Sequence, residues 1–283
     1  MGDRVRIGVV APSSFIDPAV PDEVTAFARA RYGDRVELVF DSQCLARHGH
    51  FAGTDVERAE GVLRIANDPA IDAVWFARGG YGSCRPAEAI LAGLGEAARR
   101  KTWMGYSDGG ALLAGLYRAG FPHLAHGPLP HDIRRTGGEA AVARALAWLV
   151  DRDPAALDPN LAPGEKVAAF NLTILGQILG TPLEPDLTGH VLILEEVGEY
   201  AYRIDRMMFH LTSNPAIRRV KGIRLGRCYV DENPTADFAM TAEEIVRFWC
   251  ARSGIAYLGA ADIGHDAANK VVPFGGIGRP DAP

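Results

Sequence analysis

The stretch of sequence that decides the fold runs from Thr102 to Ala119 and reads TWMGYSDGGALLAGLYRA. Residues 102–105 predict a short buried strand, and the Leu- and Ala-rich segment 109–119 predicts a helix. Between them lies GYSDG, a G-x-S-x-G pattern at a strand-to-helix turn. Such a turn presents the serine hydroxyl above a sheet, and glycines suit it because the backbone is crowded there. We therefore expect Ser107 to lie at the carboxyl end of a strand.

The sequence before this stretch alternates short apolar runs with helical patterns. Strands are expected at 6–11, 36–40 and 71–77, and helices at 21–32, 54–67 and 85–100. This alternation predicts an α/β fold in which a parallel sheet carries helices on both faces. Folds of this class place their sites at the carboxyl ends of the strands. The segments Arg78–Gly82 and Tyr106–Asp108 lie at such ends.

The composition changes after a helix expected at 138–151. Residues 151–166 contain three prolines and several acids without periodicity, which is typical of a linker. We expect residues 1–150 to form an N-terminal α/β domain and residues 167–283 to form a smaller C-terminal α/β domain, with the active site between them. In the second domain, helices are expected at 171–179, 203–212 and 242–253, and strands at 191–194, 222–229 and in the terminal segment 264–274.

Composition and charge exclude several classes of protein. The 283 residues carry a formal charge of −5, whereas a dedicated nucleic-acid binder would show a basic excess. The longest apolar run falls short of the roughly 18 residues of a membrane span, and Ile7–Val10 is too short for a signal-peptide core. We therefore expect a cytoplasmic protein that binds neither nucleic acid nor membrane. The four cysteines form no C-x-x-C pair and are expected to be reduced.

A nucleophilic serine needs a base, and the base needs an orienting acid. Glu195 and Glu196 follow the apolar strand 191–194, so a carboxylate there is well placed for a site. Among the eight histidines, His265 stands in a loop of small residues before the last strand. The residues alone leave other interpretations open: Ser107 as a helix cap, the glutamates as ion-pair partners of nearby arginines, and His265 as a surface residue.

The sequence argues against a metal or a phosphate-binding cofactor. It contains no H-E-x-x-H and no G-x-x-x-x-G-K-[ST] pattern. His48 and His50, and likewise His123, His126 and His131, have only loose ligand-like spacings. We expect no metal and no cofactor.

Several motifs occur in the order typical of a known family. They are ARGGYG (77–82), GYSD (105–108), NL to LGT (171–181), LEEVGE (194–199) with YRIDRM (202–207), and IGH to Asn269 (263–269). Together they resemble the signatures of the LD-carboxypeptidase family of serine peptidases. The resemblance covers nearly the whole chain.

The resemblance implies an α/β N-terminal domain, a smaller C-terminal domain and a Ser-Glu-His triad between them. Carried over motif by motif, Ser107 is the nucleophile, Glu195 the orienting acid and His265 the base. Glu195 is preferred to Glu196 because it occupies the first acidic position of its motif. The backbone N–H groups of Gly80 and Asp108 would form the oxyanion hole.

The family's usual substrate is a cytoplasmic muropeptide, from which a terminal D-alanine is removed at an L,D bond during cell-wall recycling. Arg78, Arg203 and Arg206 are candidates, by position, for binding its free carboxylate, although structural ion pairs are an equal alternative. The resemblance also implies a homodimer.

The sequence is compatible with three other functions. One branch of the same family hydrolyses microcin-C-type aminoacyl nucleotides, and the triad does not separate the two branches. An α/β-hydrolase esterase has the same order of triad residues, but no HGGG-type segment is visible here. A non-catalytic two-domain binding protein would use Ser107 only as a helix cap.

Overall fold

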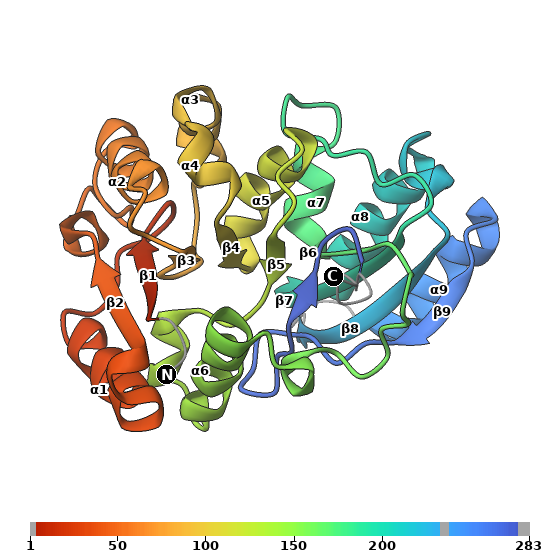
Figure 1. Cartoon of the computed structure of the whole chain (residues 1–283). Helices are drawn as coiled ribbons and strands as arrows, with labels where there is room; N and C mark the ends of the chain where they lie inside the picture. Colours follow the sequence, from red (N-terminus) through yellow and green to blue (C-terminus); the bar gives the residue numbers. More distant parts are fainter. Residues whose placement is uncertain (1–3, 233–237, 277–283) are drawn as a thin grey trace.

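The computed structural model describes residues 4–232 and 238–276 and contains two sheets (Figure 1). The ends of the two predicted domains, residues 1–3 and 277–283, lie outside the described residues. The first sheet has the strand order β10-β5-β4-β3-β1-β2. Its strands are β1 (Val5–Val10), β2 (Val36–Phe40), β3 (Ala73–Phe76), β4 (Thr102–Gly105), β5 (Leu124–His126) and β10 (Val272–Pro273). All pairings are parallel except that of β10 with β5.

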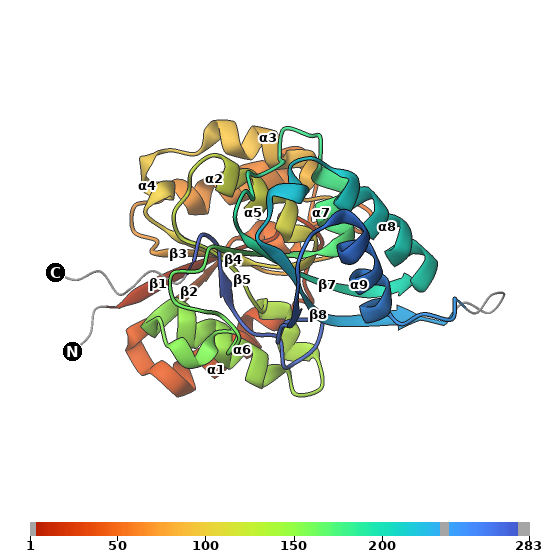
Figure 2. The same cartoon turned by 90° about the vertical axis from the view of Figure 1, so that its right-hand side faces the viewer.

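Helices cover both faces of this sheet, as Figure 2 shows. They are α1 (Val20–Tyr32), α2 (Asp55–Asn67), α3 (Cys84–Gly93), α4 (Glu96–Arg99), α5 (Gly110–Arg118) and α6 (Gly138–Leu146). Alternate residues of β3 point to opposite faces. Val74 and Phe76 join the core under α2, α3 and α5, whereas Trp75 joins the core under α1 and α6. The apolar runs of the parallel strands are thus buried on both sides.

The second sheet has the order β6-β7-β8-β9 and is parallel throughout. Its strands are β6 (Val167–Asn171), β7 (Val191–Tyr200), β8 (Gly222–Asp231) and β9 (Tyr257–Ala260), and its helices are α7 (Leu172–Ile178), α8 (Ala201–Ser213) and α9 (Ala242–Ser253). The predicted fold class, an α/β protein with an N-terminal parallel sheet and a smaller C-terminal α/β part, is confirmed. The exact domain bounds stay a prediction, and β10 returns from the C-terminal part to pair with the first sheet.

Several predicted elements differ from those observed. β5, β6 and β9 were not predicted. β5 is only three residues long, β6 runs directly into α7 as one apolar segment, and β9 contains Gly259, so none of them shows a distinct strand pattern. The helix predicted at 85–100 is broken between α3 and α4. There the Asn67 side chain accepts a hydrogen bond from Gly95 N and donates one to Gly93 O, which ends α3. β7 continues six residues beyond its predicted end, to Tyr200.

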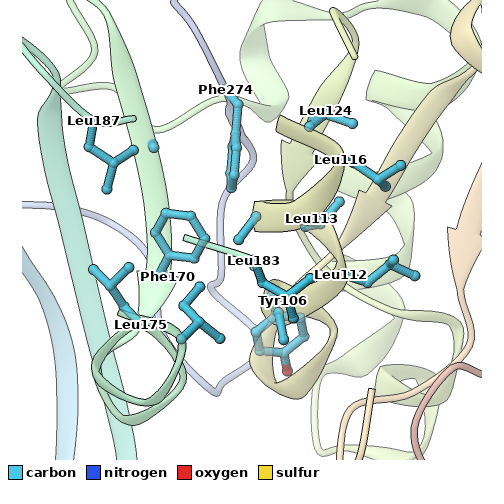
Figure 3. Close-up of a cluster of buried hydrophobic side chains, with 14 of the residues drawn as sticks. Tyr106, Leu112, Leu113, Leu116, Leu124, Phe170, Leu175, Leu183, Leu187 and Phe274 are labelled. Atoms are coloured by element: carbon cyan, nitrogen blue, oxygen red, sulfur yellow. The ribbon is translucent and has the colours of Figure 1, made fainter. Parts of the chain in front are cut away.

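A shared apolar core joins the two sheets. Figure 3 shows Phe170 of β6 and Phe274 beside Leu113 and Leu116 of α5. The rings of Phe170 and Phe274 have centroids 5.2 Å apart, and Phe274 also contacts Tyr117. This packing fixes how the carboxyl ends of the two sheets face each other.

We expect Phe274→Ala to lower the free energy of unfolding by about 3–5 kcal/mol, because it removes a buried ring and leaves a cavity. Phe274 is 4% exposed. Urea unfolding of the variant and the wild-type protein measures the difference. Phe248→Ala is a matched control, since that ring is 47% exposed. Equal losses in both variants would contradict the role of the shared core.

Within residues 4–232 and 238–276, no helix has both the length and the apolar character needed to cross a membrane.

Candidate active site

Ser107 lies in a sharp turn between β4 and α5. Its φ of 59° is in the left-handed region, which costs a residue other than glycine about 1–2 kcal/mol. The flanking glycines are required by packing. A Cβ at Gly105 would lie 2.3 Å from Cδ2 of Phe76, and one at Gly109 would lie 2.8 Å from the same atom. The turn therefore holds Ser107 in a strained conformation at the carboxyl end of β4.

The three residues expected to form a triad are joined by hydrogen bonds. His265 Nε2 lies 3.0 Å from Ser107 Oγ, and His265 Nδ1 lies 2.5 Å from Glu195 Oε2. Ser107 follows a strand of the first sheet, whereas Glu195 belongs to β7 and His265 to the loop after β9. The two sheets thus meet at this point, which explains why their relative position matters for the site.

The hydrogen-bond partners define the tautomer of His265. An ionised carboxylate only accepts hydrogen bonds, so Nδ1 carries the proton that is donated to Glu195. Nε2 then has a free lone pair and accepts the Ser107 hydroxyl. Glu195 is fully buried, and the His265 side chain is 8% exposed. The imidazole is therefore oriented by a carboxylate that water does not reach.

Glu195 and Glu196 point to opposite faces of β7, as consecutive strand residues do. Glu196 accepts hydrogen bonds from Asn171 Nδ2 at 2.8 Å, from Thr173 N at 2.9 Å and from Thr173 Oγ1 at 2.7 Å. These bonds tie β7 to the start of α7. Glu196 is consequently a structural carboxylate, and only Glu195 faces His265.

A bulge between β7 and β8 lies opposite Glu195. The register shifts between Leu194 and Glu196. Two residues of β8, Gly226 and Arg227, therefore lie opposite the single residue Glu195 of β7. A Cβ at Gly226 would lie 2.7 Å from Ile263 O and 3.2 Å from the Glu195 Cβ. A glycine at this position therefore lets the segment that leads to His265 pass directly beside Glu195.

The glycine-rich loop after β3 lies against Ser107. A Cβ at Gly79 would lie 2.8 Å from Ser107 Oγ and 3.8 Å from Asp108 N. Gly80 has a φ of 110°, where a side chain is strained, and its Cβ would lie 2.1 Å from Ser14 Oγ. The backbone of this loop can approach the serine closely because it carries no side chains there.

The Asp108 side chain holds this loop in place. Its carboxylate accepts hydrogen bonds from Gly82 N at 3.1 Å, from Ser83 N at 2.8 Å and from Ser13 Oγ at 2.5 Å. Asp108 is buried. The residue after the serine thus links the turn to the loop that carries Gly80.

The fold agrees with comparisons to known proteins. The profile of the LD-carboxypeptidase N-terminal domain matches residues 7–127, and that of the LD-carboxypeptidase C-terminal domain matches residues 166–279. The chain belongs to the LD-carboxypeptidase family. It is therefore a member of a peptidase family, and the alternative that it is an α/β-hydrolase esterase is excluded.

Individual relatives carry names consistent with this family. A Synechocystis protein named as a carboxypeptidase is 32% identical over 245 residues, which cover 84% of this chain and 79% of the relative. The murein tetrapeptide carboxypeptidase of Pseudomonas aeruginosa is 29% identical in an alignment of 290 positions, which covers 95% of this chain and 91% of the relative.

Solved structures show the same fold. The muramoyltetrapeptide carboxypeptidase of Oxalobacter formigenes superposes with a TM-score of 0.79 at 21% identity, covering 96% of this chain and 93% of that chain. The microcin C7 self-immunity protein MccF, in complex with aspartyl sulfamoyl adenosine, gives 0.77 at 20% identity, covering 97% and 92%. Both solved structures therefore share the architecture of this chain.

A pocket of about 500 Å³ opens onto Ser107 and His265. Of the three arginines predicted to bind substrate, Arg78 lines this pocket. Arg203 and Arg206 are not among the lining residues. On α8, Arg203 pairs with Glu199 at 3.1 Å, and Arg206 stacks over the Tyr202 ring. Arg78 thus lies at the pocket beside Ser107, whereas Arg203 and Arg206 lie elsewhere on the surface of α8.

Several residues that line the pocket were not predicted as part of this site, among them His131, Arg134 and Arg135. These three belong to the loop after β5, which lies at the same edge of the sheet as the Ser107 turn. A correct assignment of the three-residue β5 would have pointed to them, because loops at the carboxyl ends of parallel strands form the site. Burial lowers the pKa of His131 to about 4, so its ring is neutral near pH 7.

Among the described residues, no cluster of three or more histidine, cysteine, aspartate or glutamate side chains is arranged to hold a metal ion. His126, one of the loosely spaced histidines, is instead buried in β5, where Nε2 lies 3.4 Å from Asn269 Oδ1.

We expect His126 to make the protein less stable in acid. Burial lowers the pKa of His126 to about 3, against about 6.5 in an unfolded chain. Between these values the unfolded chain binds a proton that the folded protein does not, so the free energy of unfolding falls as the pH is lowered from about 6.5 to about 3. Urea unfolding at a series of pH values should show a weaker acid dependence in His126→Gln. The same dependence in both proteins would contradict this assignment.

Proposed function

We propose that this protein is a serine LD-carboxypeptidase in which Ser107 is the nucleophile, His265 the general base and Glu195 the acid that orients the base. The observation that carries the proposal is the continuous hydrogen-bond chain from Glu195 through His265 to a serine with positive φ. A nucleophile, its base and an orienting group within hydrogen-bond reach are what covalent catalysis requires.

In the first half of the reaction, Ser107 Oγ attacks the carbonyl carbon of the scissile amide while His265 Nε2 takes the hydroxyl proton. The C–N bond then breaks, and His265 gives that proton to the leaving amine. Water attacks the acyl-enzyme in the second half, with His265 again acting first as base and then as acid. Glu195 stays ionised and stabilises the imidazolium formed in both halves.

The N–H groups of Gly80 and Asp108 are proposed to bind the oxyanion of the tetrahedral intermediates. The close approach of Gly79 to Ser107 Oγ and Asp108 N supports this assignment. The carboxylate of Asp108 keeps the loop at the serine. Donors held in place before the reaction are worth about 2.7–4 kcal/mol each in comparable sites.

The proposed substrate is a muropeptide tetrapeptide that ends in D-alanine. A relative named murein tetrapeptide carboxypeptidase, 29% identical over most of both chains, supports this choice. The pocket offers a cation for the terminal carboxylate. Arg78 donates a hydrogen bond to Phe15 O at 3.0 Å and has no ion pair within the described part of the chain. Arg134, in contrast, is paired with Glu23.

A second candidate is hydrolysis of an aminoacyl nucleotide, the reaction implied for the microcin-C branch. The observation that favours it is Tyr81, which lines the pocket and is 71% exposed. An exposed aromatic ring at the mouth of a site can stack on a nucleobase.

A substrate panel tests the two candidates. The purified protein is incubated with a tetrapeptide ending in D-alanine, with the same peptide ending in L-alanine, and with an aminoacyl sulfamoyl adenosine. Mass spectrometry then measures the products. The proposal predicts release of alanine from the D-alanine peptide alone. Cleavage of the nucleotide analogue alone would assign the protein to the other branch, and cleavage of the L-alanine peptide would contradict the L,D specificity.

The cytoplasmic location expected from the sequence and the homodimer implied by the family resemblance stay predictions.

A further inference from the structure

Three arginines bind the loop that carries His265: Arg135, Arg144 and Arg227. Arg227 comes from β8, in the same sheet as Glu195. It forms ion pairs with the two aspartates of the loop, Asp262 and Asp266. The second sheet therefore fixes the loop through charge pairs.

The other two arginines reach the loop from the first half of the chain. Arg144 of α6 donates hydrogen bonds to Ala267 O and, at 3.2 Å, to Asn269 O. Arg135, from the loop after β5, donates from Nη1 to the backbone carbonyl of His265 itself. The first half of the chain, which carries Ser107, is thus hydrogen-bonded through Arg135 directly to His265, the proposed acceptor of the Ser107 proton.

Arg135 is oriented by a buried carboxylate. Asp132 Oδ1 accepts a hydrogen bond from Arg135 Nε at 2.8 Å and another from the Tyr106 hydroxyl at 3.2 Å. Asp132 is 4% exposed. The ring of Tyr106 in turn lies against His265, with centroids 4.9 Å apart. Asp132 therefore holds two groups in place. One is Arg135, which donates to the His265 backbone, and the other is the Tyr106 ring, which lies beside the His265 imidazole.

These contacts restrict movements of His265 that its hydrogen bond to Glu195 does not prevent. The bond from His265 Nδ1 to Glu195 fixes one edge of the imidazole, but the ring and its backbone can still pivot about that bond. Arg135 and Tyr106 hold the backbone and one side of the ring from the half of the chain that bears Ser107. A displacement of about 1 Å in such an arrangement can cost about 10²-fold in rate.

We propose that Arg135 is a positioning residue. By donating a hydrogen bond to the His265 carbonyl, it keeps the imidazole within hydrogen-bonding distance of Ser107, and it does not act through the substrate. The proposal rests on the proposed function only in taking His265 as the base for Ser107. It does not depend on which amide or ester is cleaved.

A small neutral fluorophosphonate probe separates positioning from substrate binding. The probe carries no carboxylate, so its rate of reaction with Ser107 reports on the base and not on recognition of a charged substrate. We expect Arg135→Ala to lower this second-order rate about 10- to 100-fold, and Arg135→Lys to restore part of it, because lysine keeps one donor. Arg247→Ala is the matched control, since Arg247 pairs with Glu243 on the surface of α9, and its rate should equal that of the wild type.

Steady-state kinetics with the cleaved substrate give a second readout. Positioning predicts a lower kcat for Arg135→Ala with KM within about threefold of the wild type. An unchanged probe rate together with a raised KM would overturn the proposal and make Arg135 a substrate-binding residue. If the wild-type protein reacts with the probe but leaves the tetrapeptide intact, the proposed substrate fails, and the probe rates alone still decide the role of Arg135. Circular dichroism of each variant confirms that it is folded.

Discussion

Ser107→Ala is expected to lower kcat by at least about 10⁴-fold, the loss seen when a nucleophile that works with its base is removed from a serine hydrolase. The fold should persist, because Ser107 Oγ bonds only to the active-site imidazole in the described structure. Turnover of the purified variant and the wild-type protein, measured with the substrate that the panel identifies, gives the ratio.

Ser107→Gly makes this prediction sharper. Ser107 has a φ of 59°, and glycine adopts that conformation without the strain of a side chain. We expect the glycine variant to be as inactive as the alanine variant but about 1 kcal/mol more stable than the latter. Activity retained in either variant would remove Ser107 from the mechanism.

The second large effect is expected at Glu195. Glu195→Gln keeps the size of the side chain but removes the charge that orients and stabilises the imidazole. We expect kcat to fall about 10³- to 10⁴-fold, because the amide no longer holds the useful tautomer. Glu195 is fully buried, so water cannot replace the lost charge.

Glu196→Gln is the matched control at the next position of the same strand. Its carboxylate binds Asn171 and Thr173 and does not face the imidazole. We expect kcat within about tenfold of the wild type and a loss of about 1–3 kcal/mol in the free energy of unfolding. Kinetics and urea unfolding of both variants measure the two effects. A larger loss of kcat at Glu196 than at Glu195 would mean that the faces of β7 are assigned the wrong way round.

The parts of the site that could be predicted from the sequence are those with a local pattern. The G-x-S-x-G turn pointed to Ser107, and the apolar run 191–194 pointed to a buried carboxylate at its end. The choice of Glu195 over Glu196 came from the family resemblance, because alternation along a strand does not say which face meets the partner sheet.

Other features depend on contacts between distant residues. Arg135 is 130 positions from His265, and no local spacing connects them. β5 is only three residues long, and β9 contains Gly259 with a φ of 91°, so neither shows a regular strand pattern. The bulge opposite Glu195 likewise results from the pairing of β7 with β8. Predictions from sequence failed where the tertiary arrangement, and not the local pattern, determines the structure.

The most direct test of the central claim is incubation of the purified protein, and of Ser107→Ala in parallel, with a muropeptide tetrapeptide ending in D-alanine, followed by mass spectrometry. The account predicts that the wild-type protein alone converts the tetrapeptide to the tripeptide and free alanine. Conversion by both proteins would contradict the role of Ser107. An intact tetrapeptide with the folded wild-type protein would contradict the proposed substrate.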